Sequence, residues 1–213
     1  MEQKNRKVMI FLAGDLRNEE NILSMIKSGD FDFYAADAGY LPAKRFGVPL
    51  RRVLGDFDSA EKPDIDDLLI YPSEKDQTDS ELALEHAIQD GYREIWMVAP
   101  FGGRLDHSIA NLCLLESASL KGVTLKLYDG ENLAYLLHQK EHELSQNYRY
   151  ISFFPWKSNA EISLHGFKYP LGHFNLRLEQ PIGVSNEPTD LPRVEVHDGT
   201  VLCICVENTR EEL

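Results

Sequence analysis

The chain has 213 residues, of which 43% are hydrophobic and 27% charged, a composition typical of a folded globular protein rather than a disordered one. Its 22 lysines and arginines against 35 aspartates and glutamates give a formal net charge of −13. A negative field of this size disfavours nucleic acid and anionic membrane surfaces as partners. An anionic substrate would therefore need a metal ion or local basic groups to be held.

The cysteines and the first residues bear on the cellular compartment. Cys113, Cys203 and Cys205 form no C-x-x-C motif, and the last two alternate along an expected strand, which favours packing over metal ligation. The first apolar run spans only about seven residues, too few for a membrane span, and no signal-peptide cleavage pattern follows it. The sequence therefore predicts a cytoplasmic protein without a membrane segment.

In the first part of the chain, continuous apolar runs alternate with helical patterns. This alternation is typical of an α/β fold with an open, mainly parallel sheet and flanking helices. The strands are expected at 8–13, 33–36, 51–54, 68–71, 95–99 and 123–128, and the helices at 19–27, 78–91 and from 105 onward.

Aspartates follow three of these strands, at Asp15, at Asp37 and at the pair Asp56 and Asp58. Ligands of open α/β sheets bind outside the carboxyl ends of the strands, so several aspartates at this edge indicate a site. The pair alternates along an extended segment, so both carboxylates can converge on one hard cation such as Mg²⁺. An acidic turn explains an isolated D-x-D motif as well, and the motif alone leaves both interpretations open.

The segment after the fourth strand opens a helix. Thr78 and Glu81 have the spacing of a capping box, and Gly91 is placed to end the helix. Capping explains these two residues completely. Asp79 can complement the helix N-terminus or serve as a further metal ligand, and Thr78 can face a phosphate; this stretch alone does not decide.

Two glycines and an arginine lie between the fifth strand and the next helix. Backbone N–H groups at Gly102 and Gly103 can approach an anion, and the planar side chain of Arg104 suits phosphate oxygens. The pattern matches neither G-x-G-x-x-G nor a Walker A loop, so the glycine pair is a weak signal by itself.

The helix after Arg104 carries apolar residues at helical spacing. Asp106, His107 and Asn111 are expected nearer the rim of the site, with His107 as a surface residue rather than a catalytic base. The expected buried face consists of Leu105, Ile109, Leu112 and Cys113.

From about Asn132 the long helices disappear, and short alternating runs separated by turn residues take over. Asp198 and Gly199 form a two-residue hairpin signal within the last run. This pattern predicts a small antiparallel β-sandwich. We therefore expect two domains, 1–135 and 136–213, with further strands at 133–137, 148–154, 161–164, 174–178 and 194–206.

Taken together and in order, the motifs resemble the thiamine pyrophosphokinase family of the bacterial type. The residues that carry the resemblance are 37–39, 55–59, 76–84 and 102–111, with 166–171 and 183–187 in the second half. It extends over nearly the full length. Asp15 and Ala38 stand where glycines are commoner in that family, and neither departure removes a carboxylate.

The resemblance implies an ATP-dependent enzyme that transfers the pyrophosphoryl group of ATP to the hydroxyl of thiamine, giving thiamine diphosphate and AMP. It implies that residues 1–135 bind the nucleotide and the metal, with Mg²⁺ held by Asp56, Asp58 and Asp79. Arg104 would join these three aspartates in catalysis by stabilising charge on the phosphates. The residues implied to contact ATP are Asp37, Gln77, Thr78, Gly102, Gly103, Arg104 and Asp106.

Residues 136–213 would, by the same resemblance, bind thiamine and form a homodimer, with the acceptor at the dimer interface. The residues implied to contact thiamine are Asp106, Ser185, Asn186 and Trp156. A cation over the face of Trp156 would be favourable, although an aromatic residue that fills the edge of the sandwich explains this tryptophan better. No dedicated general base is evident.

Two other classes remain. A haloacid-dehalogenase-like phosphatase also uses D-x-D after a strand, but it needs a Thr or Ser motif and a Lys on later strands, and residues 76–81 open a helix instead. A non-catalytic thiamine- or nucleotide-binding regulator is the other alternative, and the presence of every expected carboxylate argues against it.

Overall fold

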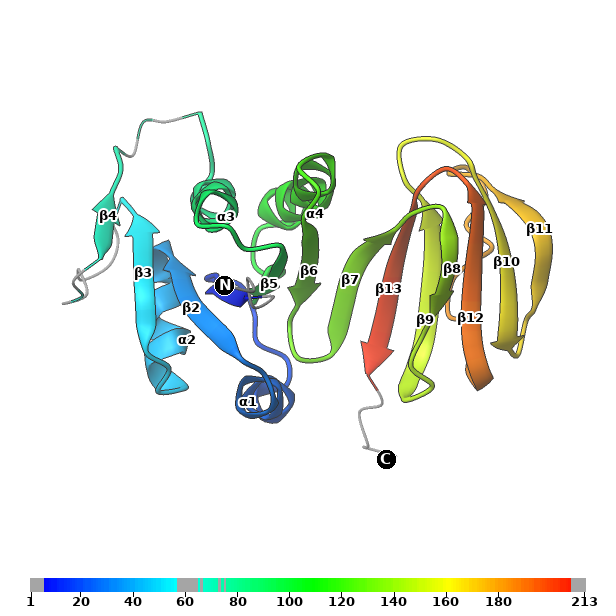
Figure 1. Ribbon diagram of the computed structural model, residues 1–213, viewed down its shortest axis with the longest axis horizontal. Coiled ribbons are helices and arrows are strands. Elements are labelled where there is room, and N and C mark those ends of the chain that lie inside the picture. Colours follow the sequence, from blue (N-terminus) through cyan, green and yellow to red (C-terminus); the bar gives the residue numbers. More distant parts are fainter. Residues whose placement is uncertain (1–5, 57–64, 66, 73, 75, 208–213) are drawn as a thin grey trace, which may run out of the picture. The chain divides into compact units, whose positions relative to one another are not determined.

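The computed structural model describes residues 6–56, 65, 67–72, 74 and 76–207 (Figure 1). It divides into two compact units, Met1–Gly130 and Glu131–Leu213, whereas the sequence analysis placed the division after residue 135. Each unit is described by itself below.

The first unit is a parallel sheet in the order β4-β3-β2-β1-β5-β6. The chain runs outward from β1 to β4 and then returns to the other side of β1 for β5 and β6. The direction of winding therefore reverses between β1 and β5, and ligands bind at such a reversal in open α/β sheets. The strands are β1 (Lys7–Phe11), β2 (Phe31–Ala36), β3 (Leu50–Gly55), β4 (Leu68–Ile70), β5 (Glu94–Val98) and β6 (Thr124–Tyr128).

Helices connect these strands and cover both faces of the sheet, α1 and α2 on one face and α3 and α4 on the other (Figure 1). Asn18 caps α1 and Thr78 caps α3 through their side-chain oxygens, as residues of these types commonly do. The predicted α/β architecture is confirmed. The helices are α1 (Glu19–Ser28), the short 3₁₀ turn η1 (Asp37–Gly39), α2 (Tyr40–Arg45), α3 (Asp79–Gln89) and α4 (Leu105–Leu120).

The expected buried face of α4 is wrong. Leu105 is 74% exposed, Ile109 is 52% exposed and Cys113 is exposed. The helix instead packs through Leu114, Leu115 and Ala118 and through Asn111, which was expected at the rim. Helix α4 has apolar residues on more than one face, so spacing alone could not identify the side that meets the sheet.

The second unit contains two antiparallel sheets, with strand orders β7-β13-β9 and β11-β10-β12-β8. The ring of Phe153 on β9 packs edge-on against Phe167 on β10 at 5.7 Å, which joins the two sheets. Cys203 and Cys205 are buried, as the packing interpretation predicted. The strands are β7 (Asn132–Leu137), β8 (Lys140–Glu143), β9 (Tyr148–Pro155), β10 (Ala160–Phe167), β11 (Leu171–Leu176), β12 (Pro188–Asp198) and β13 (Val201–Glu207).

The predicted antiparallel sandwich is therefore confirmed, although several strands differ from their predicted ranges, since β10 spans Ala160–Phe167 instead of 161–164 and β11 spans Leu171–Leu176 instead of 174–178. Strand β8 was not predicted, because Lys140 to Glu143 are polar at each position, and β12 begins at Pro188 instead of 194. The predicted hairpin is wrong: Gly199, at φ 78°, turns the chain between β12 and β13, but these two strands belong to different sheets, β12 beside β10 and β8 and β13 beside β7 and β9. In the described part of the chain, no helix is long and apolar enough to cross a membrane.

Candidate functional site

A cleft of about 380 Å³ lies at the carboxyl ends of β1 and β5, at the reversal of the sheet. Three aspartates line it, Asp15, Asp37 and Asp79, together with the arginine Arg104. The balance of these charges is negative, so a polyphosphate can enter only with cations that offset the carboxylates. The described residues that line the cleft are 12–15, 36–37, 78–80, 99–104, 107 and 111.

The loops after β1 and β5 are joined backbone to backbone on the floor of the cleft. Gly14 donates to the carbonyl of Ala99 at 3.1 Å, and Asp15 donates to the carbonyl of Phe101 at 2.6 Å. Gly102 has φ 116° and lies against the Asp15 side chain, where a Cβ would come within 2.3 Å of the carboxyl carbon. Glycine at this position therefore permits both the turn and the close approach of the carboxylate.

The ends of β2 and β3 also approach each other closely. Asp37 follows β2 with φ 47°, an uncommon backbone conformation for a residue other than glycine. A Cβ on Gly55 would lie 2.9 Å from the Asp37 Cα, so glycine at the end of β3 is required for this approach. Asp56 follows directly and is half-buried. Asp58, the next expected metal ligand, lies outside the described residues.

The first turn of α3 forms a wall of the cleft through Thr78, Asp79 and Ser80. Thr78 Oγ1 accepts from the backbone N–H of Glu81 at 3.2 Å, which is one of the two hydrogen bonds of the predicted capping box. The Oδ1 atom of Asp79 is buried and accepts no hydrogen bond within the described part of the chain, although the residue has other interactions. The carboxylate therefore stands at the positive end of the helix and faces the cleft.

Gln77 was expected to contact ATP, but its side chain turns toward helix α3. Its amide donates to Glu85 Oε2 at 3.0 Å, and Gln77 is not among the residues that line the cleft. This hydrogen bond, followed by the ammonium of Lys121, lowers the pKa of Glu85. Gln77 thus braces the start of α3 in this structure.

Arg104 stands at the opposite wall, immediately before α4, with an exposed side chain. Its Nε lies 3.1 Å from Asp106 Oδ1, and a second guanidinium nitrogen reaches Asp106 Oδ2. Hydrogen bonding to Arg104 lowers the pKa of Asp106 to about 2, so this carboxylate is charged at any working pH. Asp106 itself does not line the cleft, whereas the exposed His107 does.

The residues of the second unit that are expected to contact thiamine differ from one another in exposure and in hydrogen bonding. Ser185 is exposed and holds a left-handed backbone at φ 56°. Asn186 is 4% exposed and is bound on both sides of its amide: Oδ1 accepts from the N–H groups of Tyr169 and Glu187, and Nδ2 donates to the Tyr169 carbonyl. Trp156 follows β9 and is half-buried.

Both units match models of known protein families. Residues 6–127 match the family model described as thiamin pyrophosphokinase, catalytic domain, and residues 138–201 match the one described as thiamin pyrophosphokinase, vitamin B1 binding domain. Thiamine pyrophosphokinase of Bacillus subtilis (strain 168) is 35% identical over 161 residues, 71% of this chain and 72% of that protein. The chain belongs to the thiamin pyrophosphokinase family.

Solved structures of thiamin pyrophosphokinases agree with this assignment. The Bacillus subtilis structure has a TM-score of 0.83 at 27% identity and covers 95% of this chain and 100% of that one. The Geobacillus thermodenitrificans structure has a TM-score of 0.82 at 25% identity and covers 96% and 99%. The resemblance found from the motifs is confirmed, and the chain is an enzyme of the thiamin pyrophosphokinase family.

The chemistry of the donor set fits Mg²⁺, because carboxylate oxygens are the ligands that this ion prefers. Among the residues that the structure describes, no group of three or more Asp, Glu, His or Cys side chains is arranged to hold an ion. Of the three expected metal ligands, only Asp56 and Asp79 are described, and Asp79 is the one that lines the cleft.

Sequence reasoning gave no role to two residues of the cleft, Ser80 and Asn111. Ser80 donates to Asn111 Oδ1 at 2.7 Å, and Asn111 Nδ2 donates to the carbonyl of Pro100 at 2.7 Å. Both residues stand within the motifs that resemble the family. Their hydrogen-bond partners lie on other elements, and no local sequence signal identifies such contacts.

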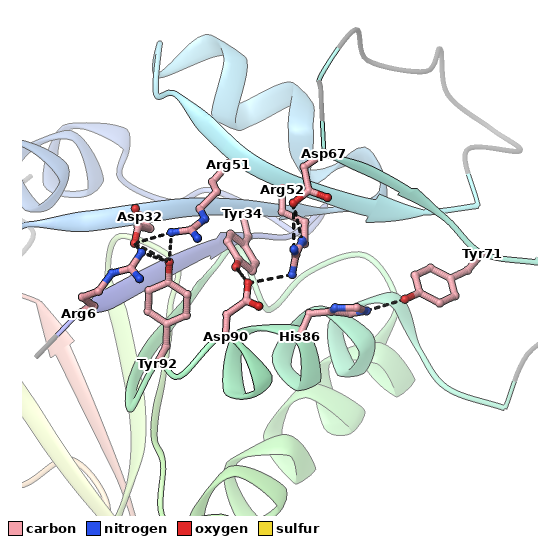
Figure 2. A network of polar contacts seen from close by, with 10 residues as sticks. All are labelled: Arg6, Asp32, Tyr34, Arg51, Arg52, Asp67, Tyr71, His86, Asp90 and Tyr92. Atoms are coloured by element: carbon pink, nitrogen blue, oxygen red, sulfur yellow. Dashed lines mark hydrogen bonds and ion pairs between the residues drawn. The ribbon is translucent and has the colours of Figure 1, made fainter. Parts of the chain in front are cut away.

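A second polar network connects residues of β2 and β3 with the C-terminal end of α3 (Figure 2), and none of the residues drawn there lines the cleft. Asp90 ends α3 and receives hydrogen bonds from Tyr34 on β2 and Arg52 on β3, the latter at 2.8 Å. Nearby, Tyr92 donates to Asp32 at 2.5 Å, and Arg6 also pairs with this carboxylate. These contacts fix the far end of the helix whose first turn forms a wall of the cleft.

Proposed function

We propose that this chain transfers the pyrophosphoryl group of ATP to the hydroxyl oxygen of thiamine, yielding thiamine diphosphate and AMP. The observation that carries the proposal is the cleft at the strand reversal, with its aspartates and Arg104, in a chain that matches the catalytic and vitamin B1 binding models in order. The family membership supplies the reaction, and the residues of the cleft supply the chemistry it needs.

The nucleotide would lie along the floor of the cleft. Gly102 and Gly103 both have positive φ values, 116° and 56°, and form a turn before the N-terminus of α4. Such a turn lets phosphate oxygens approach the backbone closely and meet the positive end of the helix. Asp37 and Thr78 would complete the nucleotide side, and Arg104 would place its guanidinium on the phosphates.

Asp56, Asp58 and Asp79 would hold Mg²⁺. When bound, the ion would neutralise the phosphate chain and orient the group to be transferred. This proposal is supported by the position of Asp56 at the end of β3 and of Asp79 in the cleft. The proposed ion also explains how an acidic protein can bind ATP, which is itself an anion.

In the transfer, the thiamine hydroxyl oxygen forms a bond to the β-phosphorus of ATP, and the bond between that phosphorus and the oxygen bridging it to the α-phosphate breaks. AMP leaves with the bridging oxygen, and the hydroxyl proton passes to a carboxylate or to water. Arg104 would stabilise the charge that develops on the phosphate oxygens. Its pairing with Asp106 holds the guanidinium at the N-terminus of α4 before substrate binds.

Thiamine would contact Asp106, Ser185 and Trp156, and we propose that the acceptor lies at the interface of a homodimer. The exposed Ser185 can offer its hydroxyl directly. The buried Asn186 would act by holding the backbone beside Ser185, since its amide already binds Tyr169 and Glu187. Light scattering at micromolar protein concentrations tests the dimer, and a mass of 24.3 kDa, that of one chain, would contradict it.

Phosphorus NMR tests the reaction. Purified protein with ATP, Mg²⁺ and thiamine is expected to form AMP and thiamine diphosphate in equal amounts, and EDTA is expected to stop it. ADP with thiamine monophosphate would instead show an ordinary kinase and would refute attack at the β-phosphorus. Free phosphate without loss of thiamine would show a phosphatase, and thiamine binding without turnover would show a regulator.

Two variants test the metal assignment. Asp79→Asn removes the charge from the cleft and is expected to lower kcat by about 10²-fold or more, because a positioned electrostatic contact to the reacting phosphates is lost. Asp30→Asn is the matched control, since Asp30 is an exposed carboxylate before β2, at the opposite end of the sheet. Equal activity of both variants would contradict the role of Asp79.

A further inference from the structure

Asn111 is a buried polar side chain on the inner face of α4, 7% exposed, in the second turn of the helix. Burying an amide is unfavourable unless its donor and acceptor are both bonded. Here Oδ1 accepts from Ser80 Oγ and Nδ2 donates to the Pro100 carbonyl, each at 2.7 Å. The two partners belong to different walls of the cleft.

The Ser80 side of this bridge is the first turn of α3. Ser80 Oγ also lies 3.1 Å from Thr78 Oγ1, the atom that caps the helix. Asp79 stands between them in the chain and lines the cleft. A shift of Ser80 would therefore move the cap and the carboxylate together.

The Pro100 side of the bridge is the loop after β5. Ala99 has φ 57°, a strained conformation for alanine, and this residue turns the chain out of the sheet. Ala99 is held by β6 through its N–H and by Gly14 through its carbonyl. Asn111 supplies the donor for the next carbonyl, that of Pro100, just before the Gly102 and Gly103 turn.

We propose that Asn111 is a positioning residue that sets the distance between the two walls of the cleft. The α3 wall carries Thr78 and Asp79, and the loop wall carries Gly102, Gly103 and Arg104. Both walls must meet one phosphate chain, and a displacement of about 1 Å in such a site can cost roughly 10²-fold in rate. This inference rests on the proposed function for its kinetic consequence, but the bridge itself is independent of it.

A second contact between α3 and α4 provides the matched control. Lys121 Nζ pairs with Glu85 Oε1 at 3.3 Å, near the far ends of these helices and outside the cleft. Such an exposed pair contributes little. Lys121→Met thus removes a link between the same two helices without touching the bridge through Asn111.

Kinetics give the first readout. Asn111→Ala is expected to lower kcat/KM for Mg·ATP by about 10- to 100-fold, Ser80→Ala by less, and Lys121→Met by under about 2-fold. Because Ser80 and Asn111 share one hydrogen bond, the loss in the double variant is expected to be smaller than the product of the two single losses, even though Ser80 also contacts Thr78. Ser80→Thr keeps the hydroxyl and is expected to retain most of the wild-type kcat/KM. Activity within about 2-fold of the wild type in both alanine variants would overturn the proposal, as would losses that multiply in the double variant.

Amide hydrogen exchange gives a readout that needs no turnover. The amides to follow are Glu81 and Leu82 on α3, and Asp15 and Gly102 in the joined loops. Asn111→Ala is expected to speed exchange at both pairs, Ser80→Ala only on α3, and Lys121→Met at neither. Unchanged exchange at either pair in Asn111→Ala would overturn the proposal.

The two readouts separate the bridge from the proposed function. If the wild-type protein makes no thiamine diphosphate, the proposed function fails, and hydrogen exchange alone decides the bridge. If Asn111→Ala does not fold, Ser80→Ala still tests it, since Ser80 is half-buried and its variant deletes one hydroxyl. Unchanged exchange on α3 and unchanged kinetics in Ser80→Ala would then refute the bridge.

Discussion

At the scale of single residues, Ser185 and Asn186 show that neighbouring residues of one motif can have different roles. The Asn186 amide satisfies the N–H groups of Tyr169 and Glu187 and the Tyr169 carbonyl, and it is buried. Asn186→Ala leaves these three backbone groups without a partner, so we expect it to lower the free energy of unfolding by about 2–3 kcal/mol. Urea denaturation measures this loss.

Ser185→Ala is the matched control for that prediction. Its side chain is exposed, so the free energy of unfolding is expected to change by less than about 0.5 kcal/mol. The KM for thiamine should rise if the hydroxyl contacts the acceptor as proposed. A stable Asn186→Ala protein with a raised KM would instead make Asn186 a direct ligand of thiamine.

Sequence reasoning located the aspartates better than it located their supports. Asp37 follows its strand directly and Asp79 opens its helix, so strand ends and capping signals were enough to bring them to one edge. Asn111 could not be found in this way, because its two partners lie on α3 and after β5. A bond between elements leaves no trace in local spacing.

At the scale of elements, α4 shows the limit of periodicity. Leu105 and Ile109 form an apolar stripe as regular as the buried one, and a helix that is apolar on several faces gives no unique direction. The polar Asn111 lies on the buried face because Ser80 and the Pro100 carbonyl satisfy it. The parallel strands of the first unit were predicted well, since strands buried on both faces are continuously apolar.

Helix α3 is fixed at its far end by the polar network of Figure 2, in which burial raises the pKa of both Tyr34 and Tyr92. Burial, and then the hydrogen bond to Asp32, raise the pKa of Tyr92 to about 12 from an ordinary value of 10. Burial and the bond to Asp90 likewise raise the pKa of Tyr34. The folded state therefore binds these protons more tightly than the unfolded chain does.

This linkage predicts the alkaline limit of stability. Because the pKa of Tyr92 is raised in the folded state, its contribution is complete below pH 10 and is lost as the pH rises through about 12. Tyr92→Phe is expected to lower the free energy of unfolding by about 1–2 kcal/mol at pH 7 and to make its decline between pH 10 and 12 shallower. Urea denaturation across this range measures both effects.

The control for this prediction is Tyr169→Phe, since Tyr169 is 60% exposed. This variant is expected to keep both the stability at pH 7 and the slope of the wild type. If Tyr92→Phe declined as steeply as the wild type, the alkaline loss would have to come from Tyr34 or other groups.

At the scale of the whole molecule, the two-unit fold persists at low sequence identity. The thiamin pyrophosphokinase of Candida albicans has a TM-score of 0.75 at only 16% identity, which shows a shared fold. What the sequence alone predicted for the whole chain, an α/β unit followed by an antiparallel sandwich, depends on patterns of burial that such divergence preserves. The contacts around Asn186 and Asn111 depend on single residues and had to be seen.

The net charge of −13 predicts opposite salt dependences for the two proposed substrates. Thiamine carries a positive thiazolium ring that the field of the protein attracts, whereas Mg·ATP is an anion that the same field repels. The Debye length shortens from about 10 Å at 0.1 M salt to about 3 Å at 1 M, so added salt screens both effects. From 0.1 to 0.5 M KCl at saturating Mg²⁺, the KM for thiamine should therefore rise by roughly 2- to 5-fold, while the KM for Mg·ATP falls or stays constant.

Steady-state kinetics with each substrate varied in turn measure the two constants, and circular dichroism at each salt concentration checks that the fold is unchanged. A parallel rise of both constants would show that local contacts in the cleft, such as Arg104 with the phosphates, outweigh the overall field.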